Sequence, residues 1–203
     1  KGPASSLYGS EAVGGLINVI TKLPENSPRF FADAFVTGWG ETNLDLGFKA
    51  QVGKKATVLV GTNYFKFDGL VDNNNDNFTD LTLQDRISIF QKWDFKRASN
   101  RKLSLAGRYF YEDRWGGELQ WNKTYRGGDA IYGESIYTSR FEILGNYELP
   151  LSEKVNFQFS YSDHDQNSVY GNTLYLAQQR IGFGRLIWDK KIDNIRFPYY
   201  IVQ

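Results

Sequence analysis

Period-two alternation of apolar and polar side chains constrains this chain more than any other feature of its sequence. From Leu44 to Val52 every second residue is apolar, and polar residues such as Asp45 and Lys49 occupy most of the positions between. Because successive side chains point to opposite faces of a strand, the pattern predicts a β-strand with one apolar and one polar face. The alternation recurs in five further segments: 56–64, 86–95, 103–112, 140–149 and 155–162. Less regular strands are predicted at 30–38 and 178–189, so the chain is expected to be all-β.

The polar face of these strands carries many charges, and aromatic residues gather at the strand ends. Arg, Lys, Glu and Asp recur at the polar positions, which suits a hydrated lumen. The aromatic residues form two groups: Tyr64, Tyr109, Tyr111 and Tyr161 in one, and Trp93, Phe95 and Tyr147 in the other. Membrane β-barrels alternate lipid-facing and lumen-facing residues and place aromatic girdles at both interfaces. A soluble antiparallel sandwich with half-buried strands gives a similar alternation and stays open as an alternative.

Connection lengths favour the barrel. Short connections are predicted at 53–55, 96–102, 150–154 and 190–194, and long ones at 68–81 and 114–137, with an intermediate one at 166–172. After the first hairpin, short and longer connections alternate, as in barrels with short turns on one rim and long loops on the other. The sequence therefore predicts a partial transmembrane antiparallel β-barrel of about eight strands and the start of a ninth.

The residue inventory argues against catalysis and nucleic-acid binding. The chain has no Cys and one His, and it contains neither a phosphate-binding glycine loop nor a G-x-S-x-G elbow. We therefore expect no enzyme and no redox cofactor. The formal net charge of +1 predicts no nucleic-acid partner. No apolar run approaches the roughly 18 residues that a membrane-spanning helix requires.

The opening segment, KGPASSLYGSEAVGGLINVITK, differs from everything that follows it, being small, glycine-rich and apolar at its end. It resembles the last part of the plug domain of TonB-dependent outer-membrane receptors. The residues that carry the resemblance are Gly2, Pro3, Leu7, Tyr8, Gly9, Gly14, Gly15, Ile17, Asn18, Ile20 and Thr21. They span about a tenth of the chain, and the predicted strands begin directly after them.

The resemblance implies that residues 1–24 are the C-terminal end of a plug and residues 25–203 the first part of the barrel. The chain is then expected to be an internal fragment of a receptor in the outer membrane of a Gram-negative cell. The stretch from Tyr170 to Trp188 is most similar to receptors of the Bacteroidetes. Such receptors take up scarce nutrients, driven by the TonB–ExbB–ExbD complex, here through plug residues outside this sequence. The other implied partners are outer-membrane lipid and a small nutrient chelate.

The plug segment also bears on the substrate. Glycan importers of the family end their plug in a pattern like Tyr-Gly-Ser-Arg-Gly-Ala-Asn-Gly, whereas this chain reads Tyr-Gly-Ser-Glu-Ala-Val-Gly-Gly from Tyr8. The difference favours a metal chelate, either a ferric siderophore or cobalamin. An oligosaccharide importer, with a surface lipoprotein as partner, is the alternative within the family.

An Asn-rich stretch at 72–80 has the oxygen-donor spacing of a calcium loop. Hard Ca²⁺ takes six to eight oxygen ligands, and a D-x-N-x-D run lets a tight loop supply several of them. The loop departs from an EF-hand at Asn77, where Gly is usual, and at Leu83, where a bidentate Glu is usual. A solvated Asn-rich turn is the alternative. The predicted calcium ligands are Asp72, Asn74, Asp76, Asp80 and the carbonyl of Phe78.

The long connection at 114–137 is rich in aromatic residues, which predicts capture of a flat or amphipathic ligand. Its predicted ligand-binding residues are Trp115, Trp121, Tyr125, Arg126 and Tyr132. The alternative is the ordinary aromatic content of a loop beside a membrane girdle.

The only histidine, His164, lies between Asp163 and Asp165, which could raise its pKa or join it in binding a metal; an unremarkable exposed His is the alternative.

Overall fold

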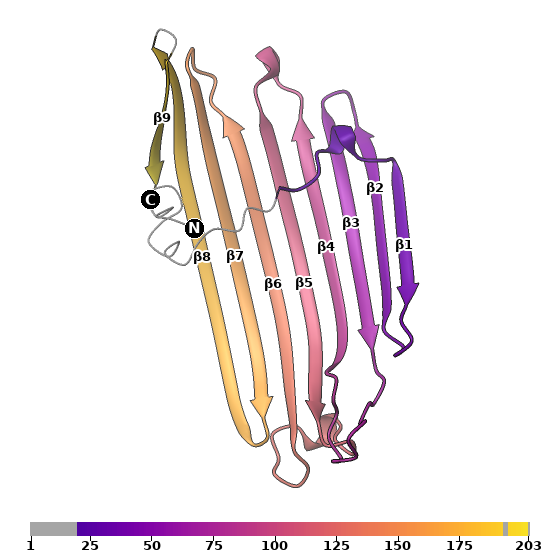
Figure 1. Ribbon diagram of the computed structural model, residues 1–203. Coiled ribbons are helices and arrows are strands. Elements are labelled where there is room, and N and C mark those ends of the chain that lie inside the picture. The colour runs from indigo at the N-terminus through magenta and orange to yellow at the C-terminus, as the bar shows by residue number, and fades with distance from the viewer. Residues whose placement is uncertain (1–19, 193–194, 203) are drawn as a thin grey trace.

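The computed structural model describes residues 20–192 and 195–202, and the side chains up to residue 190. The described residues form one antiparallel sheet in which the strands follow one another in chain order (Figure 1). The strands are β1 (Phe30–Val36), β2 (Thr42–Val52), β3 (Ala56–Phe67), β4 (Leu83–Phe95), β5 (Leu103–Gly117), β6 (Gly133–Glu148), β7 (Lys154–Tyr170), β8 (Thr173–Ile192) and β9 (Ile195–Val202). The described residues also form three short 3-10 helices: η2 (Pro24–Asn26), η3 (Ala98–Asn100) and η4 (Lys123–Tyr125).

The predicted all-β class is confirmed, and the sheet is an open meander. Within the described residues β1 and β9 each pair with one neighbour, so the sheet does not close into a barrel. Of the predicted plug segment 1–24, residues 1–19 lie outside the described residues. In the described part of the chain no helix is both long and apolar enough to cross a membrane.

Two predicted connections at the long-loop end are longer than those in the structure. β7 continues to Tyr170 and β8 begins at Thr173, so the connection predicted at 166–172 shrinks to residues 171–172. β5 and β6 also extend into the loop predicted at 114–137, which leaves 118–132 as the connection. These extensions are polar on both faces in places, as at Gln166–Ser168, so hydrophobic alternation does not mark them. Backbone pairing to the neighbouring strand orders them instead.

The strand register sorts side chains onto an apolar face and a charged face. In the register, Leu46 lies opposite Thr62 and Thr62 opposite Ile89, which places these three side chains on one face. We call it the apolar face, and its members across the sheet include Leu44, Phe48, Val60, Ile87, Trp93, Leu105, Tyr109, Phe141, Ile143, Phe157 and Tyr161. The charged face carries Lys49, Arg86, Lys92, Arg108, Arg140 and Glu142. The predicted alternation is therefore confirmed across the sheet.

Apolar side chains occupy the apolar face along only part of each strand. On β5 the apolar stretch runs from Leu103, at the short-turn end, to Tyr111. Nearer the long loops the same face becomes polar, with Asp85 directly opposite Asp113 and Asp163 directly opposite Arg180. The boundary stays at one register position from β2 to β5 and moves toward the short turns from β5 to β7. We call the apolar stretch of this face the apolar band.

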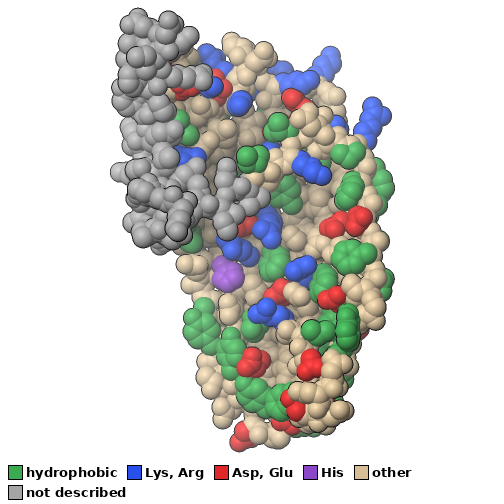
Figure 2. Space-filling model, in the orientation of Figure 1, with side chains coloured by type: hydrophobic (Ala, Val, Ile, Leu, Met, Phe, Trp, Pro, Cys, Tyr) green, Lys and Arg blue, Asp and Glu red, His purple; other side chains and the backbone are tan. Residues whose placement is uncertain are grey.

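The segment that precedes β1 lies on the charged face, across the upper part of the sheet in Figure 1. The Nζ atom of Lys92 donates to Thr21 Oγ1 at 3.0 Å and to the Lys22 carbonyl at 3.4 Å. The Nζ atom of Lys49 donates to the Glu25 carbonyl at 3.3 Å. Figure 2 views this face and shows Lys, Arg, Asp and Glu side chains scattered over its length. Lysines of the charged face therefore fix the chain where it enters the sheet.

We predict that Gly117→Ala destabilises the long-loop end. Gly117 has φ +147°, and an added Cβ would lie 2.5 Å from the Tyr132 carbonyl oxygen, where backbone must move. The substitution should cost roughly 1–3 kcal/mol of folding free energy and lower the melting temperature. Gly182→Ala is the control, because its Cβ would meet nothing within 4 Å. Equal melting temperatures for the two variants would contradict this account of the turn.

Candidate functional site

The two long connections, 68–82 and 118–132, pair with each other beyond the end of the sheet. The Thr79 amide donates to the Gly117 carbonyl at 2.8 Å, and the Leu119 amide donates to the Asn77 carbonyl at 3.0 Å. The Thr79 hydroxyl also accepts a hydrogen bond from the Gly117 amide at 3.0 Å. These bonds attach one loop to the tip of β5, so the two loops build one structure.

A groove of about 350 Å³ lies between the joined loops and the ends of β5 and β6. Its walls combine two aromatic rings with charged groups, and its main lining residues are Phe78, Tyr132, Asp80, Arg114, Glu134 and Ile136. The ring centroids of Phe78 and Tyr132 are 6.2 Å apart. Arg114, Glu134 and Ile136 come from the charged face, so the groove opens on that side of the sheet. This combination suits a ligand with an apolar or planar body and polar substituents.

Tyr132 is held in the groove by two carboxylates. Its hydroxyl donates to Glu134 Oε1 at 2.8 Å, and its amide donates to Glu118 Oε1 at 2.8 Å. The hydrogen bond to Glu134 raises the pKa of the Tyr132 phenol, with burial and the carboxylate charge adding to the effect. The phenol therefore stays neutral at physiological pH and remains a hydrogen-bond donor.

The five predicted ligand-binding residues do not form one site. Tyr132 and Trp115 both line the groove. Trp121 is buried instead, with its ring centroid 4.8 Å from that of Trp115. Tyr125 is exposed on η4, and its carbonyl accepts from the Gly128 amide.

Arg126 fastens the second long loop to the sheet. Its Nε atom donates to Ser135 Oγ at 3.1 Å, and its Nη2 atom donates to Asn167 Oδ1 at 2.8 Å. The guanidinium also lies 4.6 Å from the ring centroid of Tyr137. Beside it, Lys123 forms a 2.7 Å ion pair with Asp113, and this hydrogen bond raises the pKa of Lys123. These partners belong to the polar end of the apolar face, so Arg126 orders the loop from the side opposite the groove.

Sequence reasoning missed Arg114, Glu134 and Ile136 as groove residues. These three residues continue the alternation of the charged face, but they fall within the predicted connection at 114–137. Continuing the period-two register past residue 112 would have put Arg114 on the charged face.

In the calcium-like loop, carboxylates bind backbone amides. Asp72 accepts from the amides of Asp76 and Asn77, at 3.2 and 3.0 Å, and Asp80 accepts from the Asn73 amide at 2.7 Å. The Phe78 amide donates to Asp76 Oδ1 at 2.9 Å, and Asn74 donates to Asp76 Oδ2 at 2.9 Å. Among residues 20–192 and 195–202, no three His, Cys, Asp or Glu side chains are grouped closely enough to hold a metal. Calcium binding by this loop stays a prediction.

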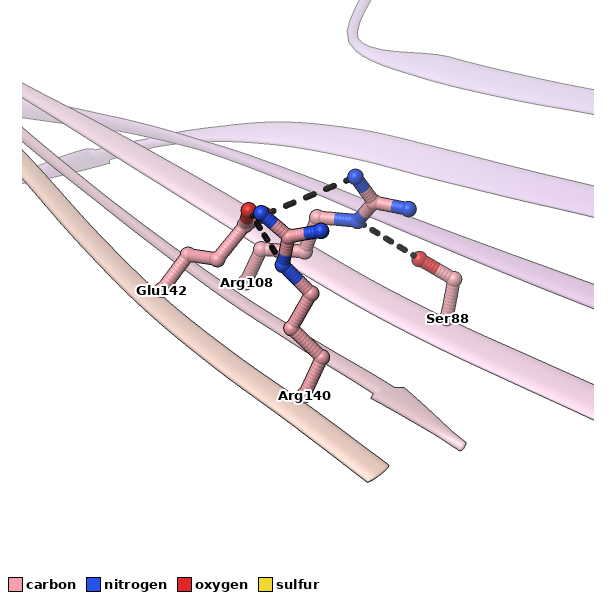
Figure 3. A network of polar contacts seen from close by, with 4 residues as sticks. All are labelled: Ser88, Arg108, Arg140 and Glu142. Carbon is pink, nitrogen blue, oxygen red and sulfur yellow. Dashed lines mark hydrogen bonds and ion pairs between the residues drawn. The ribbon is translucent and has the colours of Figure 1, made fainter. Parts of the chain in front are cut away.

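The middle of the charged face holds a shared ion pair, drawn in Figure 3. Arg140 Nε lies 2.9 Å from Glu142 Oε1, and Arg108 Nη1 lies 3.5 Å from Glu142 Oε2. Arg108 also donates to Ser88 Oγ at 3.4 Å. Two guanidinium groups thus share one carboxylate, which leaves positive charge at this point of the charged face. Exposed pairs of this kind contribute little to stability.

His164 lies on the charged face, opposite Arg140 and Gln179. The flanking Asp163 and Asp165 are on the apolar face, because adjacent residues of a strand point to opposite sides. The Asp163 and Asp165 side chains therefore lie on the face opposite to the one that carries His164.

No protein-family model matches the chain, and no solved structure matches it.

Calcium provides a direct test of the loop at 72–80. If the loop binds Ca²⁺, adding it should raise the melting temperature of the protein, and chelation should reverse the increase. Asp76→Ala should abolish the increment because it removes one of the predicted ligands. Asp129→Ala, which removes an exposed carboxylate from the other long loop, should leave the increment intact. An unchanged melting temperature with and without calcium would contradict the prediction that this loop binds Ca²⁺.

We also predict that Arg126→Ala loosens residues 118–132. Losing charge-assisted hydrogen bonds should cost about 1.5–3 kcal/mol locally and speed hydrogen exchange of the loop amides more than tenfold. Tyr125→Ala, at an exposed neighbouring position, is the matched control and should change exchange little. Similar exchange in both variants would mean that Arg126 does not order the loop.

Proposed function

We propose that this chain is part of a TonB-dependent outer-membrane receptor, in which the sheet is one section of a transmembrane barrel wall. The receptor would take up a scarce nutrient, most favourably a metal chelate such as a ferric siderophore or cobalamin. One observation carries the proposal: a single sheet exposes a continuous apolar band on one face and a charged surface on the other. Lipid outside and water inside would satisfy both faces.

The dimensions of the band support a membrane-spanning role. Its nine residues from Leu103 to Tyr111 on β5 match the roughly 9–11 residues of a tilted transmembrane strand. From β5 to β7 the boundary of the band shifts along the register, as it does where a membrane plane crosses tilted strands. Additional strands would have to cover the open edges at β1 and β9, since unpaired backbone groups are not tolerated in lipid.

The soluble β-sandwich alternative requires a second layer over the apolar face. The described residues form one layer. Leu44, Phe48, Ile89 and Phe157 remain 36%, 49%, 40% and 38% exposed, respectively. A soluble monomer rarely leaves so large an apolar surface uncovered. In the proposed barrel, lipid would cover this surface and no second protein layer would be needed.

Uptake is supported by what lies on the charged face. The segment at 20–29 enters the sheet there, bound by Lys49 and Lys92, where a plug inside the barrel would connect to its wall. The groove at the long-loop end opens on the same side and offers Phe78, Tyr132 and Arg114 to a planar chelate. A plugged path needs work to open, which the TonB–ExbB–ExbD complex would supply. Catalysis has no part in this proposal.

The two faces can be distinguished by paired substitutions at adjacent positions. Ile143 is on the apolar face and Leu144 on the charged face, and both side chains are exposed in the sheet. In the membrane-inserted protein, Ile143→Arg should cost about 2–4 kcal/mol near the bilayer centre, and Leu144→Arg should cost much less. The measurement is the unfolding free energy in lipid vesicles. A larger cost at Leu144 would reverse the assignment of the faces.

Substrate class requires a growth test in the natural host. A deletion strain should fail to grow when a ferric chelate or cobalamin is the limiting source, and disruption of TonB should have the same effect. Growth failure on an oligosaccharide alone would instead favour the glycan-importing alternative and a lipoprotein partner. Normal growth on all of these nutrients, with the protein in the outer membrane, would contradict transport and favour an adhesive or structural barrel.

A further inference from the structure

The two ends of the sheet carry opposite charge. The described connections at the short-turn end are 53–55, 96–102 and 149–153, and they hold six basic residues, Lys54, Lys55, Lys96, Arg97, Arg101 and Lys102, against one acidic residue, Glu153. The connections at the other end hold two basic residues, Lys123 and Arg126, against seven acidic residues, Glu41, Asp68, Asp72, Asp76, Asp80, Glu118 and Asp129. The charge of the described connections is thus separated along the strand axis. We call the six basic residues at the short-turn end the basic rim.

The basic rim is not neutralised within the described structure. Lys66, Lys123 and Lys190 lie close to carboxylates elsewhere in the sheet. In residues 20–192, by contrast, no rim residue forms an ion pair with a carboxylate. Arg97 and Arg101 donate only to backbone carbonyls, at Lys102, Glu148 and Leu151. Their charges are therefore available to an external anion.

The rim also forms a concave site. A depression of about 730 Å³ is lined by Lys55, Lys96, Arg97 and Arg101 together with Ala98 and Pro150. The turns that build it are joined by backbone bonds, such as the 2.7 Å bond from the Lys96 amide to the Lys55 carbonyl. Arg97 is held in place by its 4.2 Å approach to the Tyr147 ring centroid and its 2.6 Å bond to the Glu148 carbonyl. Cationic side chains from two turns thus converge on one hollow.

Immediately beside the rim, the apolar band ends in aromatic residues. Trp93 and Phe95 stack with centroids 6.3 Å apart, and Phe95 pairs in register with Ala56, the residue after Lys55. Trp188 lies under the Lys190 ammonium at 4.9 Å. Trp and Tyr favour the level of the lipid headgroups. The hollow therefore lies next to the position where phosphate groups of a bilayer would be.

We propose that the basic rim binds the phosphate of an anionic phospholipid in the leaflet that meets the short turns. The inference rests on the proposed membrane-barrel function. An acyl chain of the bound lipid would lie along the apolar band, and its headgroup phosphate would occupy the hollow lined by Lys55, Lys96 and Arg101. The cationic hollow, the aromatic residues and the apolar band lie next to one another, which favours a lipid as the ligand. An acidic protein would need no apolar surface beside the cationic hollow.

The test uses the intact membrane protein in phosphatidylcholine vesicles that contain brominated lipid, with quenching of tryptophan fluorescence as the readout. Brominated phosphatidylglycerol should bind at least about fivefold more tightly than brominated phosphatidylcholine, since one basic residue near an anionic surface contributes about 1 kcal/mol. The preference should disappear in Lys55→Gln/Lys96→Gln/Arg101→Gln. The preference for phosphatidylglycerol should survive in the charge-conserving triple variant Lys55→Arg/Lys96→Arg/Arg101→Lys. It should weaken at high salt.

The outcomes separate the two proposals. Failure of the wild-type protein to insert into vesicles would contradict the membrane barrel itself. Insertion with equal affinity for both lipids, or an unchanged preference in the neutralised variant, would overturn only the phosphate site. Capture of an acidic periplasmic protein by the rim, without any lipid preference, would also overturn it.

Discussion

The whole structure depends on a sheet whose two faces require different surroundings. Backbone pairing fixes the register of neighbouring strands, and the register then places every second side chain on the same side across the sheet. A slip of one residue in any strand would put charges such as Arg108 among Ile89 and Phe141. The apolar band and the charged face both follow from this one constraint. In the proposed receptor, lipid and a hydrated lumen supply the two environments.

Much of the sheet could be predicted from sequence because alternation is a local signal. The segment from Leu44 to Val52 reads as a strand without ambiguity, and β2 covers it fully. The signal weakens toward the long loops, where both faces of β7 are polar around Gln166–Ser168. There β7 is ordered by backbone pairing to its neighbouring strands, and the hydrophobic pattern of one segment does not reveal such pairing. The ends of β5, β6, β7 and β8 were accordingly placed too far from the long-loop rim.

The site was less predictable because it depends on contacts between distant segments. An aromatic-rich loop suggested ligand capture, but only the fold shows that Trp121 is buried and that Arg126 binds Asn167 on β7. Conversely, Phe78 was assigned a carbonyl role in a metal loop, and its ring lies in the groove beside Tyr132. Loop-to-loop pairing through Thr79 and Gly117 creates that groove, and no local pattern encodes it.

The central claim is that the apolar face touches lipid while the charged face is hydrated. Spin labels at Val60→Cys and Leu59→Cys test it most directly, because these adjacent apolar residues lie on the apolar and charged faces respectively. In the protein reconstituted in vesicles, the label at position 60 should be accessible to dissolved oxygen and shielded from a water-soluble nickel complex. The label at position 59 should show less access to oxygen from the bilayer. The reverse ranking, or equal shielding of both labels from oxygen, would contradict the account.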